Sequence, residues 1–190
     1  MPPDWTQHLE HRYTSIAEAL KKNGYQTAHV GKWHLTPRSS ERSVVEPYYP
    51  ENQGFDFNVA GNQWGAPGTY YWPYRHRRFE GVDARVENFP PEEETKGQYL
   101  TDMLTDRAVS LVEEMKDGPF VLHFAHYAVH TPIQGRKDLT EKYQSLITEE
   151  HQHHDPGYAA MVESVDHSVG RIREKLDELG LADNTIVIYT

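Results

Sequence analysis

Three side chains suited to anion binding and proton transfer follow the ends of two predicted β-strands. Lys32 and His34 come directly after one apolar segment, in the sequence Gly-Lys-Trp-His, and His130 follows another. Lysine supplies a positive charge with three donors, while histidine can donate to an oxyanion or transfer a proton near neutral pH. His123 lies inside its strand and is predicted to be a core residue, and His29 is assigned no role. A Lys-x-His pattern is a weak signal by itself, so the surrounding elements have to support it.

The first apolar segment belongs to a helix-then-strand unit. Ser15 and Glu18 fit a capping box, in which both side chains satisfy free amides at the start of a helix. The helix is predicted to run to about Lys22 and to end at the Asn-Gly pair at 23–24. Residues 25–30 then predict a short strand that ends just before the Gly-Lys-Trp-His segment.

Two further units of the same kind follow. Apolar residues recur at helical spacing over residues 100–115, and a buried strand is predicted at 120–125. The pattern repeats with a helix over residues 158–179 and an apolar run at 185–189, typical of a strand covered on both faces. This alternation predicts an α/β fold with a mostly parallel sheet sandwiched by helices. Ligands bind beyond the carboxyl ends of such strands, where the lysine and the two histidines lie.

Two stretches between these units look irregular. Residues 36–97 are rich in Pro, Gly and aromatic residues, and predict a long insertion or substrate loop within a single domain of residues 1–190. The PPEEET piece at 90–95 is interpreted as a solvated linker. Residues 137–156 are polar and predict a surface excursion, whose HQHHD cluster is either simply exposed or a metal site.

The composition excludes several kinds of protein. Hydrophobic residues make up 37% of the 190 residues and charged residues 25%, which suffices for a core and argues against disorder. The net charge of -10 argues against nucleic-acid binding, although a local basic pocket can still bind a small anion. The lack of cysteine excludes disulfides. No membrane span or signal peptide is recognised, and the compartment and oligomeric state stay open.

Long strings around these residues resemble the sulfatases, a family within the alkaline-phosphatase-like superfamily. NGYQTAHVGKWHL (23–35) resembles the second sulfatase signature, and HYAVHTP (126–132) is similar to the histidine-bearing loop of the family. Residues 158–190 resemble the helix and strand that lead into a metal-binding motif. FDFNVAGNQWGAPGTYYWPY (55–74) looks like arylsulfatase-type members that act on sulfated sugars. The resemblance implies a partial alkaline-phosphatase/sulfatase-like domain that takes part in sulfate ester hydrolysis.

The resemblance also implies roles for residues inside the matching motifs. Lys32 would bind a sulfate oxygen, and His34 would contact the hydroxylated nucleophile and assist its turnover. His130 would hydrogen-bond the sulfate or protonate the leaving alcohol. Four aromatic residues of the long loop could stack on a sugar ring, or could equally pack the loop itself: Trp64, Tyr70, Tyr71 and Trp72.

Other parts of a sulfatase site are missing from the chain. The family nucleophile is a formylglycine made from the cysteine or serine of a C-x-P-x-R type motif, and neither this motif nor any cysteine occurs here. The calcium ligands that the resemblance implies are absent as well. A divalent cation normally neutralises the charge of the sulfate. The chain is therefore expected to be a central fragment of a sulfatase catalytic domain that is inactive alone.

Two other functions fit the same residues. A non-catalytic binder of sulfated glycans would use the cationic groups and the aromatic loop, and would need no nucleophile. A hydrolase of the same superfamily that acts on phosphate or phosphonate esters would need a similar anion site. The Gly-Lys-Trp-His segment favours sulfate over these two anions.

Overall fold

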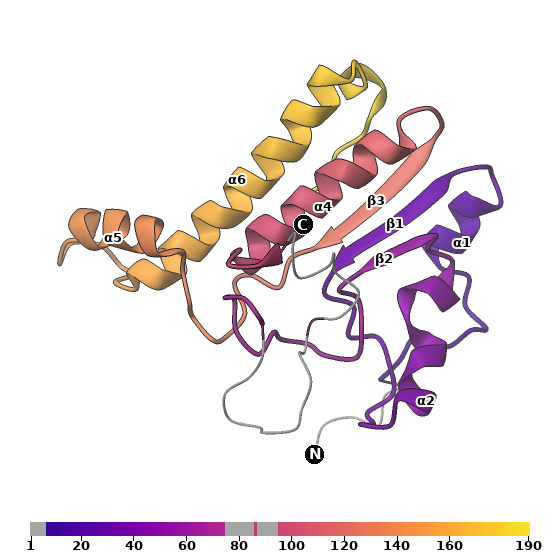
Figure 1. Ribbon diagram of the computed structural model, residues 1–190, viewed down its shortest axis with the longest axis horizontal. Helices are drawn as coiled ribbons and strands as arrows, with labels where there is room; N and C mark the ends of the chain where they lie inside the picture. Colours follow the sequence, from indigo (N-terminus) through magenta and orange to yellow (C-terminus); the bar gives the residue numbers. More distant parts are fainter. Residues whose placement is uncertain (1–6, 75–85, 87–94) are drawn as a thin grey trace.

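A parallel β-sheet forms the centre of the computed structural model, which describes residues 7–74, 86 and 95–190. Over the described residues the sheet has three strands, with β1 (Gln26–Gly31) between β2 (Phe57–Val59) and β3 (Phe120–Ala125) (Figure 1). All pairs run parallel, and His29 lies opposite His123 in the register of β1 and β3. The predicted α/β fold with a mostly parallel sheet is confirmed.

Helices cover both faces of the sheet. α4 (Leu100–Met115) packs on β1 and β3, and α6 (Pro156–Glu178) packs on α4 (Figure 1). The apolar stripe of α4 enters the core, where Leu104 and Leu111 are buried. α1 (Ile16–Lys21) contacts β1 and contributes to a separate, smaller apolar cluster. The two long helices therefore follow the periodicity of the sequence. The buried stripe of α4 covers one face of the sheet, and that of α6 packs on α4.

The predicted capping box at the start of α1 is present. Ser15 Oγ accepts a hydrogen bond from the Glu18 amide at 3.0 Å, and the Glu18 carboxylate accepts one from the Ser15 amide at 2.8 Å. Ser15 Oγ also donates to the carbonyl of Gln53 at 2.6 Å. The cap therefore fixes the first turn of α1 and ties it to the segment that precedes β2.

Residues 36–59 hold four short elements that the sequence does not predict: α2 (Arg42–Val45), the 3₁₀ helices η1 (Glu46–Tyr48) and η2 (Pro50–Gln53), and β2. The Asp56 carboxylate accepts hydrogen bonds from the Thr27 amide and hydroxyl, both at 3.0 Å. This contact places β2 beside the start of β1. The linker predicted at residues 90–95 lies outside the described residues except for Thr95.

Two predictions for the last third of the chain differ from the structure. The polar stretch after residue 136 contains α5 (Lys137–Leu146), which packs against α6. The apolar run at 185–189 follows η3 (Ala182–Asn184) but forms no strand, and Ile186 and Ile188 are 89% and 80% exposed. An apolar pattern does not supply a hydrogen-bonding partner, and no described strand pairs with this run. Among the described residues, no helix is long and apolar enough to cross a membrane.

Candidate active site

Lys32 is held at the carboxyl end of β1 by a bond to β3. Its amide donates to the carbonyl of Ala125, the last residue of β3, at 2.7 Å. The preceding Gly31 has a φ of 98°, and a Cβ added there would lie 2.0 Å from the same carbonyl oxygen. Only glycine allows this close approach of the two strand ends. The Lys32 side chain therefore starts at a fixed point where the residues after both strands meet.

His34 packs in a turn next to the segment after β2. Its φ is 58°, and its amide donates to the carbonyl of Asn62 at 3.0 Å. A Cβ on Gly65 would lie 2.5 Å from the His34 ring nitrogen Nδ1, so the glycine lets the imidazole lie against the backbone. Asn62 Oδ1 in turn accepts from the Trp64 amide at 2.8 Å. Asn62 and Gly65 thus position His34, a role that the sequence did not reveal.

His130 lies in the loop that follows β3, and a buried tyrosine holds this loop. The single hydrogen of the Tyr70 hydroxyl is shared between the carbonyls of Tyr127 and His130, whose oxygens lie 2.7 and 2.9 Å from the hydroxyl oxygen. Gln134 Oε1 accepts from the Tyr70 amide at 2.9 Å, and the Tyr99 hydroxyl donates to the Gln134 carbonyl at 2.8 Å. The aromatic segment and the histidine loop are therefore joined by hydrogen bonds on both sides of His130.

The three residues predicted from the sequence share one electrostatic environment. Burial lowers the pKa of His34, and the positive charges of Lys32, His130 and Arg38 lower it further. A lowered pKa leaves the His34 imidazole neutral at pH 7 and able to accept a proton. Within the described residues, no ion pair joins Lys32 or Arg38 to a carboxylate. The arrangement therefore favours an anion, and Arg38 is a further cation that the sequence pattern did not single out.

The four aromatic residues proposed to stack on a sugar differ in exposure. Tyr70 is fully buried, so its ring offers no face to a ligand, and the sequence-based role does not fit it. Tyr71 is 39% exposed and donates from its hydroxyl to the carbonyl of Gly135 at 2.6 Å. Trp64 and Trp72 are half-buried, and Trp72 packs against the core. Tyr71 and the two tryptophans keep exposed surface for a ligand.

A pair of histidines supports the strand ends from the other side of the sheet. His29 Nε2 lies 3.1 Å from the carbonyl of Gly31, and His29 Nδ1 lies 2.9 Å from His123 Nδ1. Because a carbonyl only accepts, His29 carries its hydrogen on Nε2 and receives a hydrogen bond from His123. Burial and the neighbouring His123 lower the pKa of His29 to about 3. His29, to which the sequence assigned no role, thus anchors Gly31. The prediction that His123 is a core residue is wrong, because His123 is exposed in β3.

The described residues do not form a metal site. No three His, Asp or Glu side chains among them are grouped so that they could hold a metal ion. The HQHHD cluster forms no such group either, and His151 Nδ1 in it accepts a hydrogen bond from the Thr148 amide at 3.1 Å. The calcium that the resemblance implies does not fit these residues, and no role of a metal is assigned to them.

Comparison with known proteins identifies relatives over almost the whole chain. The chain is 34% identical to the uncharacterized sulfatase YdeN of Escherichia coli (strain K12), over 93% of the chain and 32% of that protein. It is 31% identical to the N-acetylgalactosamine-6-sulfatase of Homo sapiens, over 92% of the chain and 31% of that protein. The chain thus spans about a third of the length of these curated relatives.

A solved structure and a family model agree with these relatives. The crystal structure of Ps i-CgsB, 27% identical in sequence, matches with a TM-score of 0.68 over 95% of the chain and 40% of that protein. Ps i-CgsB has also been solved in complex with k-i-k-neocarrahexaose. A family model described as Sulfatase matches residues 2–190. Because this model covers nearly every residue, the chain belongs to the sulfatase family.

Proposed function

We propose that the full-length protein carrying this chain hydrolyses sulfate esters of carbohydrates, and that Lys32, His34 and His130 form the sulfate-facing side of its site. The observation that carries the proposal is the convergence of these groups beyond β1 and β3, with no carboxylate paired to Lys32 among the described residues. A sulfate oxygen would take the place that a carboxylate fills in an ordinary ion pair.

Each residue has a separate part in the proposed reaction. The Lys32 ammonium binds a sulfate oxygen and offsets the charge that grows on it during hydrolysis. His34 is neutral because its pKa is lowered, so it can accept the proton of the attacking hydroxyl group. His130 donates a hydrogen bond to the sulfate or a proton to the departing alcohol. The hydroxylated nucleophile is assigned to no residue here, since the chain holds no cysteine.

The carbohydrate part of the proposal is supported by the relatives. One is named for N-acetylgalactosamine 6-sulfate, and Ps i-CgsB has been solved with k-i-k-neocarrahexaose. Tyr71, Trp64 and Trp72 keep exposed surface that could contact a sugar ring, and Tyr71 is bonded to Gly135 just after the histidine loop. Arg38 adds a further positive group to that of Lys32, which would suit a substrate that carries more than one anionic group.

The test is turnover by the full-length protein, produced together with a formylglycine-generating enzyme. We expect hydrolysis of an aryl sulfate and of N-acetylgalactosamine 6-sulfate, and a loss of about 10²- to 10³-fold in kcat/KM in Lys32→Ala. Lys22→Ala is the matched control, because Lys22 is exposed and lies away from the strand ends. Faster turnover of an aryl phosphonate than of both sulfates would favour the phosphonate hydrolase. Binding of these sulfates without turnover would favour the non-catalytic glycan binder.

A further inference from the structure

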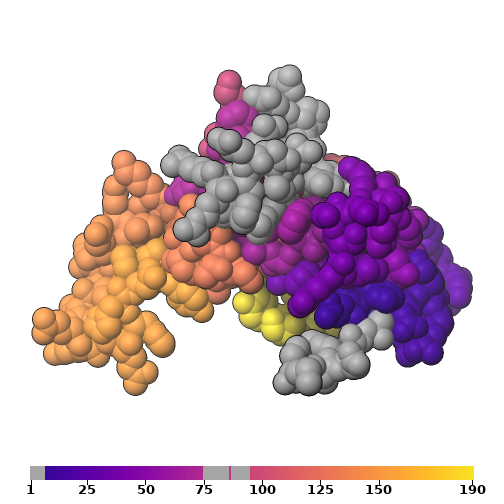
Figure 2. All heavy atoms as spheres, turned by 90° about the horizontal axis from the view of Figure 1, so that it is seen from below, coloured from indigo at the N-terminus to yellow at the C-terminus, as the bar shows by residue number. Residues whose placement is uncertain are grey.

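A cavity lies between α5 and the start of α6, away from the strand ends. Its volume is about 680 Å³, within the usual range for pockets that hold small molecules. α5 and the first turns of α6 form a lobe that projects from the rest of the molecule (Figures 1 and 2). This lobe includes the HQHHD cluster, which takes no part in the proposed site at the strand ends.

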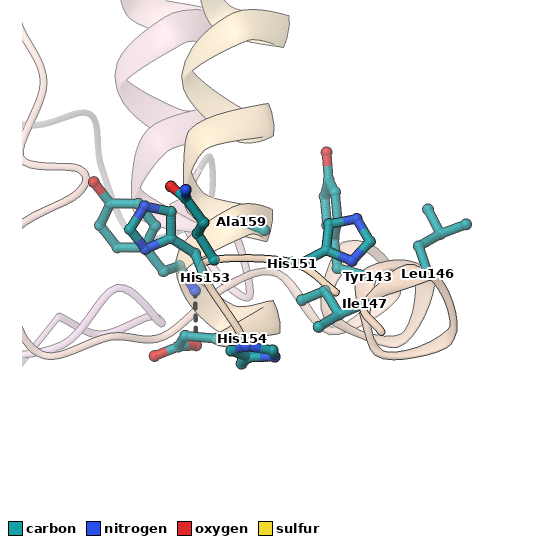
Figure 3. Close-up of a pocket in the computed structure, with 10 residues that line it drawn as sticks. Tyr143, Leu146, Ile147, His151, His153, His154 and Ala159 are labelled. Carbon is teal, nitrogen blue, oxygen red and sulfur yellow. Dashed lines mark hydrogen bonds between the residues drawn. The ribbon is translucent and has the colours of Figure 1, made fainter. Parts of the chain in front are cut away.

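Aromatic rings stand on two sides of the cavity. Tyr143 and His151 lie together on one side, next to Leu146 and Ile147, while His153 lies on the other (Figure 3). Tyr158 also lines the cavity and is 45% exposed. Aromatic faces of this kind pack well against the C–H faces of a sugar ring, because both surfaces are flat and apolar.

The polar groups of the cavity suit hydroxyl groups better than anions. His151 Nδ1 accepts from the Thr148 amide, which leaves the hydrogen on Nε2 to be donated to a ligand. Gln152 adds an amide that can both donate and accept. Among the described residues, no lysine or arginine lines the cavity, whereas Asp155 does, which disfavours a sulfate or phosphate group there.

The cavity lies within reach of the site at the strand ends. Five residue steps separate His130 from Gly135, which bounds their distance to about 18 Å. Gly135 packs directly on the first turn of α6, because a Cβ added to it would lie 2.7 Å from the carbonyl of Gly157. Gly157 precedes Tyr158 of the cavity wall. A short oligosaccharide could therefore extend from the sulfate-facing residues to the cavity.

We propose that the cavity between α5 and α6 is a saccharide subsite, which binds an unsulfated part of a sugar ring several units away from the sulfate ester. The inference rests on the proposed function, because it extends the same substrate along the surface. It makes the preferred substrate an oligosaccharide or polysaccharide, and not a monosaccharide sulfate.

The experiment measures binding and turnover by the full-length protein and its variants. The binding probes are k-i-k-neocarrahexaose and a hexasaccharide that contains N-acetylgalactosamine 6-sulfate, and the small substrate is an aryl sulfate. Tyr158→Ala and His153→Ala should weaken binding of at least one hexasaccharide about fivefold or more. Both should leave kcat/KM for the aryl sulfate within twofold of the wild type. His167→Ala is the matched control, since His167 is exposed on α6 and does not line the cavity.

The outcomes separate the subsite from the hydrolase activity. Hexasaccharide affinities in both variants equal to that of the wild type would overturn the subsite, as would wild-type protein that binds neither hexasaccharide. An equal loss on the aryl sulfate would also overturn it, because the cavity would then act through the fold. Binding that depends on Tyr158, in a protein that hydrolyses no sulfate ester, would refute the proposed hydrolase and support the saccharide site.

Discussion

Replacement of Tyr70 by phenylalanine tests whether one buried hydroxyl holds the His130 loop. The substitution keeps the ring, which stacks on Tyr99 with centroids 5.9 Å apart, and removes the donor to the Tyr127 and His130 carbonyls. Tyr70 is fully buried, so water is not available to replace the hydroxyl without a rearrangement. Burial also raises the pKa of Tyr70, which keeps the hydroxyl protonated as a donor.

The loss of stability depends on which hydrogen bonds each of the two carbonyls retains in Tyr70→Phe. The Tyr127 carbonyl still accepts from the His130 amide at 2.9 Å, so its loss is at the low end of a hydrogen bond, about 0.5 kcal/mol. The His130 carbonyl loses its donor from Tyr70 in a part-buried hydrogen bond, which costs about 1.5 kcal/mol. We therefore expect Tyr70→Phe to lower the free energy of unfolding by about 2 kcal/mol.

The assay is urea unfolding of the full-length protein, with Tyr71→Phe as the control. Tyr71 also donates to a loop carbonyl, that of Gly135, but it is 39% exposed, so water can replace its hydroxyl and the cost should stay below about 1 kcal/mol. Tyr70→Phe should also reduce kcat for an aryl sulfate more than it changes KM, because His130 would lose its fixed position. A change in unfolding free energy no larger than that of Tyr71→Phe would refute the reasoning.

Two other predictions concern stability. Gly31→Ala should lower the free energy of unfolding in urea by more than about 3 kcal/mol, because the φ of Gly31 is 98° and the new Cβ would meet the Ala125 carbonyl. In the control Gly118→Ala, no described atom lies within 4 Å of the added Cβ, so the change should stay within about 1 kcal/mol. Equal losses in the two variants would contradict the close approach of the strands. Burial holds the pKa of His29 at about 3 and that of His126 at about 4, so the unfolded chain binds more protons below its histidine pKa near 6.5. The free energy of unfolding should therefore keep its full value above about pH 6.5 and decrease as the pH falls from about 6 to 4, by up to ~1.4 kcal/mol per pH unit for each histidine. Urea midpoints that stay constant over this range would contradict the prediction.

Local signals explain why much of the fold could be predicted. The capping box at Ser15 and Glu18 is a contact between neighbours in sequence, so the residue types alone specify it. The apolar stripes of α4 and α6 reflect burial of one helix face, which periodicity records directly. The order of these helices and the strands before them then gives the parallel sheet.

The missed elements depend on contacts between distant residues. β2 has three residues, too few for a periodic pattern, and Thr27 of β1 sets its place through Asp56. The run at 185–189 was predicted to be a strand but is not one. Its apolar residues predict burial, whereas pairing also needs a neighbouring strand, which the run itself does not encode. Pattern alone therefore predicts which segments are apolar better than it predicts which of them pair.

The candidate site also contains residues that the sequence predicts and residues that it does not. The position of Lys32, His34 and His130 after the strand ends could be predicted, because the carboxyl ends of parallel strands lie at one edge of the sheet. Their chemical roles stay predictions. The position of Arg38 could not be predicted, since it approaches His34 through an irregular turn. The sequence left open whether Tyr70 stacks on a sugar or packs the loop, and its burial and its bonds to the loop carbonyls favour packing.

The net charge of -10 makes the placement of these groups more important than the total charge. At physiological ionic strength, charges more than about 8 Å apart in solvent are largely screened, so distant carboxylates repel an approaching sulfate only weakly. Attraction must then come from groups that lie within a few ångströms of the bound anion, and their geometry has to be fixed before it arrives. The bonds of Lys32 to Ala125, of His34 to Asn62, and of the His130 loop to Tyr70 supply this fixed geometry. A hydrogen bond made by a buried tyrosine can therefore matter as much to anion recognition as an added surface lysine.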